Sequence, residues 1–145
     1  MQGASALEAV VKEQAGADIR IYVVWEKILA TDYAAPGSGV LARVFDPRAV
    51  QYWDPDLLLS KTAQPVLAAS PDRVIGKKTL VTGKYVWDYE AIYPPGVTWD
   101  VAFPLPELQG APVADVAKDL MQRYWNSRSK SARRVGSARV RNSTS

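Results

Sequence analysis

Residues 18–25, Asp-Ile-Arg-Ile-Tyr-Val-Val-Trp, make up the most continuous run of β-branched and aromatic residues in the chain. These residue types favour a strand, and a run this dense is typical of the buried middle of a sheet. We therefore expect the fold to be organised around one central strand at residues 18–25.

Two helices are predicted from apolar residues that recur at helical spacing. Residues 4–15 place Leu7, Val10 and Val11 on one side, and Glu8 and Lys12 can pair one turn apart on the other. A last helix begins at Pro112. Its apolar stripe is typical of a core face and comprises Val113, Val116, Ala117, Leu120, Met121 and Tyr124.

A hairpin is predicted in the second half of the chain. Residues 86–93 read as a strand with an exposed alternate face, residues 94–96 (Pro-Pro-Gly) turn the chain, and residues 97–99 return as the partner. The prolines within residues 100–110 make that segment extended, and we do not expect it to pair centrally in a sheet.

The connecting regions carry weaker signals. Residues 40–45 suit either a short strand or the end of a helix. Asp46 and Asp54 each precede a proline, which predicts two short helices with these acids as N-caps. Pro65 is expected to interrupt the second helix, and residues 79–81 suit a strand.

The order of helix, strand, helical segment, hairpin and helix predicts an α/β fold with a central sheet and flanking helices. We expect one domain over residues 1–125, because the chain is long enough to bury a single core. No run reaches the length of a membrane span, and no signal core is visible, so a cytoplasmic protein without a membrane partner is the default expectation.

Two missing residue types narrow the chemistry. The chain has no Cys, which excludes thiol chemistry and Cys-ligated zinc, and no His, which removes the usual general base and metal ligand. We expect no cofactor and no metal, and a binding role rather than an enzymatic one.

Charge is unevenly distributed. Residues 126–145 contain six basic residues and no acid, so the remaining 125 residues have a net charge of −3 although the whole chain has +3. The Ser, Arg and Gly content of this basic tail predicts disorder. The tail could bind nucleic acid through phosphate contacts, although it lacks an aromatic residue that could stack on a base.

Candidate ligand-binding residues lie at the end of the first strand and at the starts of the two predicted short helices. Glu26 and Asp32 come after the carboxyl end of the strand, where ligands bind in open α/β sheets, but a solvated loop or a cap is the plainer interpretation. Trp53, with Asp46 and Asp54, could line a pocket, or Trp53 could be core while the acids cap helices. The full set is Trp25, Glu26, Asp32, Asp46, Trp53 and Asp54.

Several segments together resemble a bacterial group of thioredoxin-like proteins of unknown function. They are residues 21–32 (Ile-Tyr-Val-Val-Trp-Glu-Lys-Ile-Leu-Ala-Thr-Asp), 46–48 with 51–54, 86–88 and 93–96. The likeness covers roughly residues 4–125. It implies a thioredoxin-like fold in which residues 4–15 correspond to the helix after the redox motif and residues 18–25 to the next strand.

That mapping puts the usual first strand and its Cys-x-x-Cys motif upstream of Met1, so the resemblance implies a redox-inactive, truncated or degenerate domain. The leading hypothesis is a module that binds a protein or small-molecule partner through the ends of its sheet. A remnant of a thiol-redox enzyme and a nucleic-acid-associated protein are the alternatives. A lost first strand would also leave a sheet edge through which two copies could pair.

Overall fold

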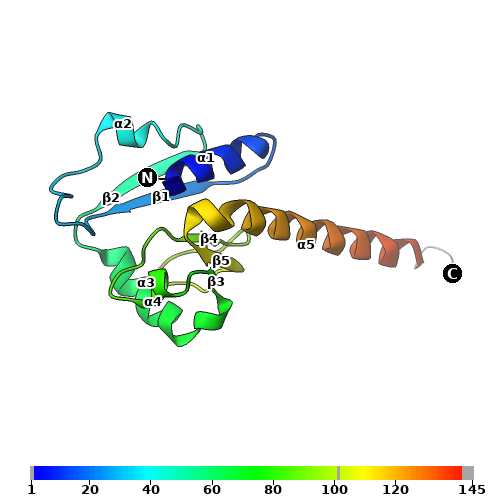
Figure 1. Ribbon diagram of the computed structural model, residues 1–145. Coiled ribbons are helices and arrows are strands. Elements are labelled where there is room, and N and C mark those ends of the chain that lie inside the picture. Colours follow the sequence, from blue (N-terminus) through cyan, green and yellow to red (C-terminus); the bar gives the residue numbers. More distant parts are fainter. Residues whose placement is uncertain (1, 101, 142–145) are drawn as a thin grey trace.

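The computed structural model describes residues 2–100 and 102–141, with side chains described as far as residue 130. It confirms a mixed α/β architecture in which helices flank small sheets (Figure 1). In chain order the elements are α1 (Gln2–Glu13), β1 (Ile21–Glu26), α2 (Ser38–Leu41), β2 (Ala49–Asp54), α3 (Leu58–Ala69), the 3-10 helix η1 (Pro71–Arg73), β3 (Ile75–Gly76), α4 (Thr79–Thr82), β4 (Glu90–Ile92), β5 (Leu108–Ala111) and α5 (Val113–Arg141).

The strands form two separate sheets. β1 and β2 pair in parallel, with Ile21 opposite Ala49 and Glu26 opposite Asp54. The second sheet has the order β3-β5-β4, in which β3 runs parallel and β4 antiparallel to β5. Since both crossovers between parallel strands contain helices, the topology is that of an α/β protein.

The predicted central strand is present as β1, but the prediction that it is the buried middle of the sheet is wrong. Ile21 is the one fully buried residue of β1, and Tyr22 is 60% exposed. The prediction that β1 shares a sheet with residues 86–99 is also wrong. β-branched and aromatic residues suit a pleated surface whether or not that surface is covered, so the composition of a strand does not reveal its number of neighbours.

The predicted hairpin is wrong in its partner. β4 pairs with β5 instead of residues 97–99, and β5 is the middle strand of its sheet although it falls within the segment that was expected to stay outside. In the intervening loop the half-exposed Trp99 ring lies 5.6 Å from that of Tyr93 and 5.2 Å from that of Phe103. These edge contacts order the loop without pairing residues 97–99 with β4.

The helix predicted at Asp46 is also wrong, because the chain enters β2 there. The Asp46 side chain accepts a hydrogen bond from the main-chain N–H of Arg48 (2.9 Å), which is a turn geometry, and the segment then pairs with β1. Residues 40–45 were expected to be either a short strand or the end of a helix, and the structure has the helix α2 at the start of this segment. Tertiary pairing with β1 decides the structure of residues 49–54.

The second predicted helix is confirmed as α3. Pro65 does not interrupt it, because it lies inside the helix. The neighbouring Ala63 and Leu67 are fully buried, and their packing offsets the cost of the proline. Residues 79–81, expected as a strand, lie in α4 instead, where the buried Val81 packs on the same core.

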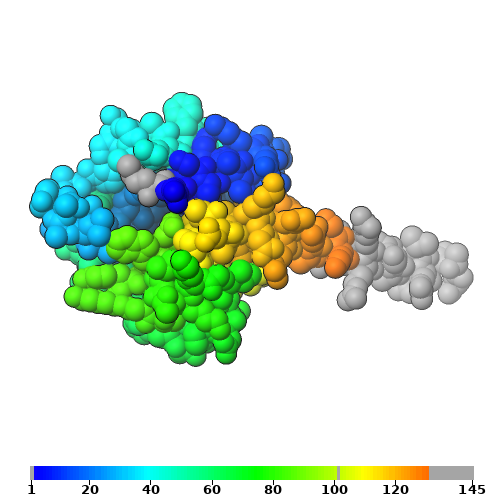
Figure 2. All heavy atoms as spheres, viewed as in Figure 1, coloured from blue at the N-terminus to red at the C-terminus, as the bar shows by residue number. Residues whose placement is uncertain are grey.

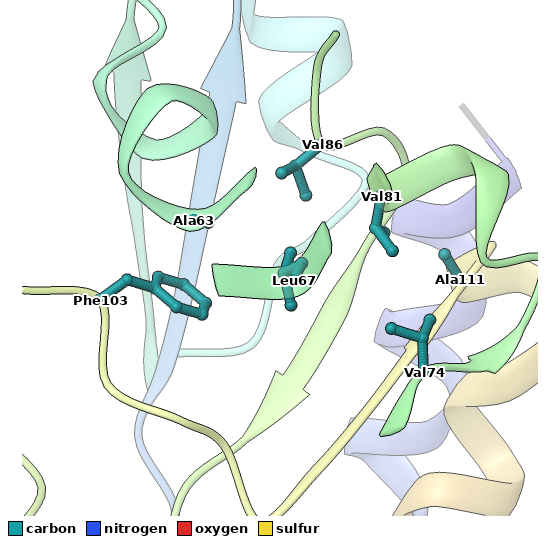
Figure 3. Close-up of a cluster of buried hydrophobic side chains, with 7 residues drawn as sticks. All are labelled: Ala63, Leu67, Val74, Val81, Val86, Phe103 and Ala111. Carbon is teal, nitrogen blue, oxygen red and sulfur yellow. The ribbon is translucent and has the colours of Figure 1, made fainter. Parts of the chain in front are cut away.

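The sheet β3-β5-β4 is covered by α3 and α4 on one face and by α5 on the other. Figure 3 shows the cluster between the sheet and α3, in which Leu67, Val81 and Ala111 are at most 1% exposed. On the opposite face a Cβ added at Gly110 would lie 3.0 Å from the Val116 side chain. A small residue on β5 therefore lets α5 lie close to the sheet.

The apolar stripe predicted for the last helix is confirmed, since all six of its members are buried. Part of this stripe, comprising Val113, Ala117 and Met121, also packs against Val10 of α1. The predicted helix at residues 4–15 is confirmed as α1, displaced by two residues. The two helices of the chain with the clearest amphipathic pattern thus pack together.

The basic tail, expected to be disordered over residues 126–145, continues α5 as a helix to Arg141, and its last four residues lie outside the described residues. Residues 126–130 are all exposed. Figure 1 shows this end of α5 running away from the packed body, and Figure 2 shows the helix already leaving the body in the coloured part before it. Over the part of the chain that the structure describes, no helix is long and apolar enough to cross a membrane.

The α5 stripe yields a test of the fold. Leu120 is completely buried, so Leu120→Ala is expected to lower the free energy of unfolding by about 2–5 kcal/mol through lost burial and a residual cavity. Leu105, which is 50% exposed, offers a matched control, and Leu105→Ala is expected to cost less than about 1 kcal/mol. Chemical denaturation measures both values, and equal costs would contradict the packing of α5 described above.

Candidate functional site

The parallel pairing of β1 and β2 brings four of the six candidate residues together at the carboxyl ends of these strands. Trp25 lies opposite Trp53, and Glu26 lies opposite Asp54. Side chains alternate along a strand, so the two tryptophans lie on one face of the sheet and the two acids on the other. Glu26 was expected just after the strand and is instead the last residue of β1, where the pairing with β2 places Asp54 beside it.

Both acids contact the first turn of α3. The Glu26 carboxylate accepts hydrogen bonds from the N–H of Ser60 (2.8 Å) and from its hydroxyl (2.6 Å), and Asp54 accepts one from the N–H of Leu59 (2.9 Å). The first N–H groups of a helix have no partners within the helix, and they carry partial positive charge. Glu26 and Asp54 thus stabilise the N-terminus of α3.

The electrostatics of Glu26 follow from this position. Burial raises the pKa of Glu26, the hydrogen bonds from Ser60 lower it, and the negative charge of Asp54 raises it again. The net direction is upward. A carboxylate whose oxygens both accept internal hydrogen bonds has little capacity left for a ligand, so the capping interpretation describes these two acids better than the ligand-binding one.

The tryptophan face of the sheet is closed by the chain around α2. The indole N–H of Trp25 donates to the Gln51 side-chain oxygen (2.9 Å), and the Gln51 amide donates to the carbonyl oxygens of Leu41 and Val44 (3.0 Å each). Trp25 and Trp53 are both half-buried. Trp25 therefore connects the sheet to its cover, and Trp53 is part of the same face.

Asp46 lies in a different polar cluster, at the end of α1. It accepts hydrogen bonds from the Arg48 guanidinium at 2.7 and 2.8 Å, and these lower the pKa of Asp46 to about 2. The same guanidinium donates to the carbonyl oxygens of Val11, Gln14 and Ala17. Arg48 thus satisfies one carbonyl in the last turn of α1 and two in the turn that follows the helix, and Asp46 orients it.

Asp32 remains in an exposed loop. Its carboxylate accepts a hydrogen bond from the N–H of Leu29 (2.9 Å), which closes a local turn. No hydrogen bond or ion pair between described residues joins it to Glu26. The expectation that Asp32 lies at a solvated loop or cap describes it correctly.

Sequence analysis missed a second polar group, inside the other sheet. Glu90 was assigned to an exposed face, but it is half-buried, its Oε2 has no hydrogen-bond partner, and burial raises its pKa to about 7. On the other face of the sheet the Gln109 side chain is 2% exposed and accepts a hydrogen bond from the Tyr89 hydroxyl (2.7 Å). The alternating pattern of residues 86–93 shows which side chains share a face of the strand, but it does not show whether other elements cover each face.

Among the residues with described placement, no cluster of three or more His, Cys, Asp or Glu side chains could hold a metal ion. Comparison of the chain with family models, curated proteins and solved structures found no match. The geometry of the chain itself therefore carries the functional argument.

The junction at Ser60 can be tested by Ser60→Ala. Ser60 is 1% exposed, and its hydroxyl donates to Glu26 and accepts a hydrogen bond from the N–H of Val86 (3.0 Å). Its loss leaves two buried groups with one partner fewer, which is expected to cost about 1–3 kcal/mol of unfolding free energy. In contrast, Thr62→Ala on the exposed side of α3 is expected to change stability by less than about 0.5 kcal/mol. Denaturant titration measures both variants, and equal stabilities would contradict a stabilising role for the Ser60 hydrogen bonds.

Glu90 predicts a pH-dependent stability. Because its pKa is raised from 4.5 to about 7 in the folded state, the unfolded chain loses this proton first as the pH rises, so folding stability falls between these two values and then levels off. The shift corresponds to at most about 3 kcal/mol.

Glu90→Gln is expected to remove this fall, so that the variant gains stability relative to the wild type from low to high pH. Glu107→Gln, at an exposed site, is expected to leave the profile unchanged. Unfolding titrations at a series of pH values provide the comparison. Parallel profiles for the wild type and the Glu90 variant would show that Glu90 does not hold its proton in the folded state.

Proposed function

We propose that this chain is a non-catalytic interaction module that binds an extended strand of a partner protein along the unpaired edge of β1, within a thioredoxin-like arrangement of strands. The observation that carries the proposal is the unpaired main chain of β1. A role in thiol chemistry has no support, because the chain contains no Cys.

The hydrogen bonds at the two ends of β1 define which of its groups are unused. The N–H of Ile21 donates to the carbonyl of Arg48 (3.2 Å), and that of Lys27 donates to Asp54 (3.4 Å). In a parallel ladder, alternate residues bond to one neighbour, so every second N–H of β1 points away from β2. These N–H groups belong to Tyr22, Val24 and Glu26. Within the described chain no other strand pairs with this edge.

The strand across from this edge is unpaired in the same way. β4 pairs with β5 on one side and has no partner on the other among the residues that the structure describes. Figures 1 and 3 show β1 and β4 as the strands through which the two sheets approach each other. An extended segment paired with β1 would add a third strand to this two-stranded sheet, as in the thioredoxin-like arrangement that we propose.

The side chains of β1 and β2 fit an apolar partner strand. Tyr22, Val50 and Tyr52 are each about half exposed or more, and the two tyrosine rings lie 6.5 Å apart on the surface of the sheet. Parallel sheets are usually covered on both faces, so a parallel pair with exposed aromatic residues is typical of a surface that becomes covered on binding. Main-chain bonds would supply affinity, and alternate side chains would supply specificity.

Small-molecule binding at the strand ends is the weaker alternative, because Glu26 and Asp54 already accept hydrogen bonds from α3. A second copy of the chain could also pair with β1. The experiment below separates these outcomes.

The edge can be tested with Val24→Pro, which removes an outward N–H and leaves the bonds to β2 in place. The probe is a synthetic peptide of alternating valine and threonine, titrated into isotopically labelled protein and followed by amide chemical shifts. We expect shifts at residues 22, 24 and 26, and about tenfold weaker binding in the variant, since one main-chain bond is lost. Val24→Thr keeps the N–H and is expected to bind like the wild type.

Shifts confined to the amides of Leu59 and Ser60, which donate to the Asp54 and Glu26 carboxylates, or equal binding by both variants, would overturn the proposal. Sedimentation of the free protein provides the third outcome. A dimer that dissociates in Val24→Pro but not in Val24→Thr would assign the edge to a second copy instead of a different partner.

A further inference from the structure

The last part of α5 lacks the buried apolar stripe of the rest of the helix. The stripe ends at Tyr124, and residues 126–130 are exposed, although Ser127 and Arg128 still contact Tyr124. Figure 1 shows the helix running beyond both sheets. Residues 126–130 add no buried residue to the core, and a helical segment that is not packed against other elements is only marginally stable in water.

The sequence of this segment makes an isolated helix still less stable. Residues 126–141 contain six cations, no acid, four serines and Gly136. Lys130 is one helical turn from both Arg133 and Arg134, and like charges at this spacing repel. The more proximal part of α5 is different, because Asp119 and Arg123 form an ion pair there (2.8 Å).

Lys130, Arg133 and Arg134 fall within about one helical turn of one another along α5, and residues 126–141 contain no acid that could neutralise them. Counter-charges from a bound polyanion would relieve their repulsion and stabilise the helix.

We propose that residues 126–141 form a basic helical arm that binds the phosphate backbone of duplex nucleic acid without sequence specificity. The arm spans about 24 Å along its axis, and it has only small residues between its cations, so it is slim enough for a major groove. Serine hydroxyls and cations are both phosphate ligands. The arm has no Gln, and its only Asn is at its first position, so it offers few groups that read bases.

Two other anionic partners fit the arm less well. An amphipathic helix that lies on a membrane carries large apolar residues on one face, whereas the only apolar residues of this segment are alanine and valine. Single strands are bound through aromatic stacking, and the arm has no aromatic residue. The arm is also separate from the β1 edge, so the two proposals are independent.

The test is a salt titration of the full chain with fluorescent duplex DNA of about 20 base pairs, followed by anisotropy. We expect equal affinity for two unrelated sequences and a loss of roughly a thousandfold between 50 and 200 mM salt if most of the six cations contact phosphates. Circular dichroism is expected to show added helix when the duplex binds.

The test variant replaces all six cations of the arm with glutamine, and we expect it to bind at least about a hundredfold more weakly at low salt. The matched control removes the same charge from exposed cations of the body. These are Arg20, Lys27, Arg43, Lys61, Lys77 and Lys84. A thermal melt confirms that both variants remain folded.

Equal loss of binding in the two variants would overturn the proposal, because net charge rather than the arm would then be responsible. Tighter binding to phosphatidylserine vesicles or to polyglutamate than to duplex DNA at the same salt would also overturn it. Preference for the duplex, loss in the arm variant alone and a gain of helix would together support it.

Discussion

The structure depends on a polar junction at the start of α3. Ser60 donates both its N–H and its hydroxyl to Glu26, and the hydroxyl also accepts a hydrogen bond from the N–H of Val86. This links β1, α3 and the segment that leads to β4. Because the two sheets share no strand, the junction, together with the packing of α1 on α5, joins the halves of the molecule.

The junction also explains why the most suggestive acids are poor ligand groups. In open α/β sheets the carboxyl ends of the strands are where ligands bind, and Glu26 and Asp54 lie there. The first turn of α3 occupies both of them, because its N–H groups need acceptors. Arg48 is used in the same way at the end of α1, where it donates to the carbonyl of Val11 and to two carbonyls in the following turn. Polar side chains at these two places serve helix ends, whereas among the described residues the outer main-chain edge of β1 pairs with no other strand.

The two proposed surfaces use different physics. The β1 edge relies on directional main-chain bonds and apolar contact, which depend little on salt, whereas the basic arm relies on charge alone, which salt screens strongly. The chain separates them along its length: residues 1–125 carry a net charge of −3, and the six cations of the arm follow. A partner could therefore engage one surface without the other.

Local periodicity was enough to predict α1 and α5, the composition of residues 18–25 indicated β1, and an acid before a proline indicated the start of α3. The six buried residues of α5 repeat at helical spacing, so each one reports the same covered face. The candidate site was predicted in part, because Glu26 follows a strand that could be recognised locally. Asp46 was predicted to cap a helix because a proline follows it. In the structure Asp46 instead closes a turn with the N–H of Arg48, and the following residues pair with β1 as strand β2.

The sequence by itself determined which residues of each amphipathic segment share its apolar face, and it excluded thiol and imidazole chemistry because the chain has no Cys and no His. Only the tertiary structure decided that β5 rather than residues 97–99 pairs with β4, that Glu90 is buried, and that β1 has one neighbour. The reason is physical. A period of two or 3.6 residues identifies the faces of an element, whereas pairing and cover depend on segments far away in the chain.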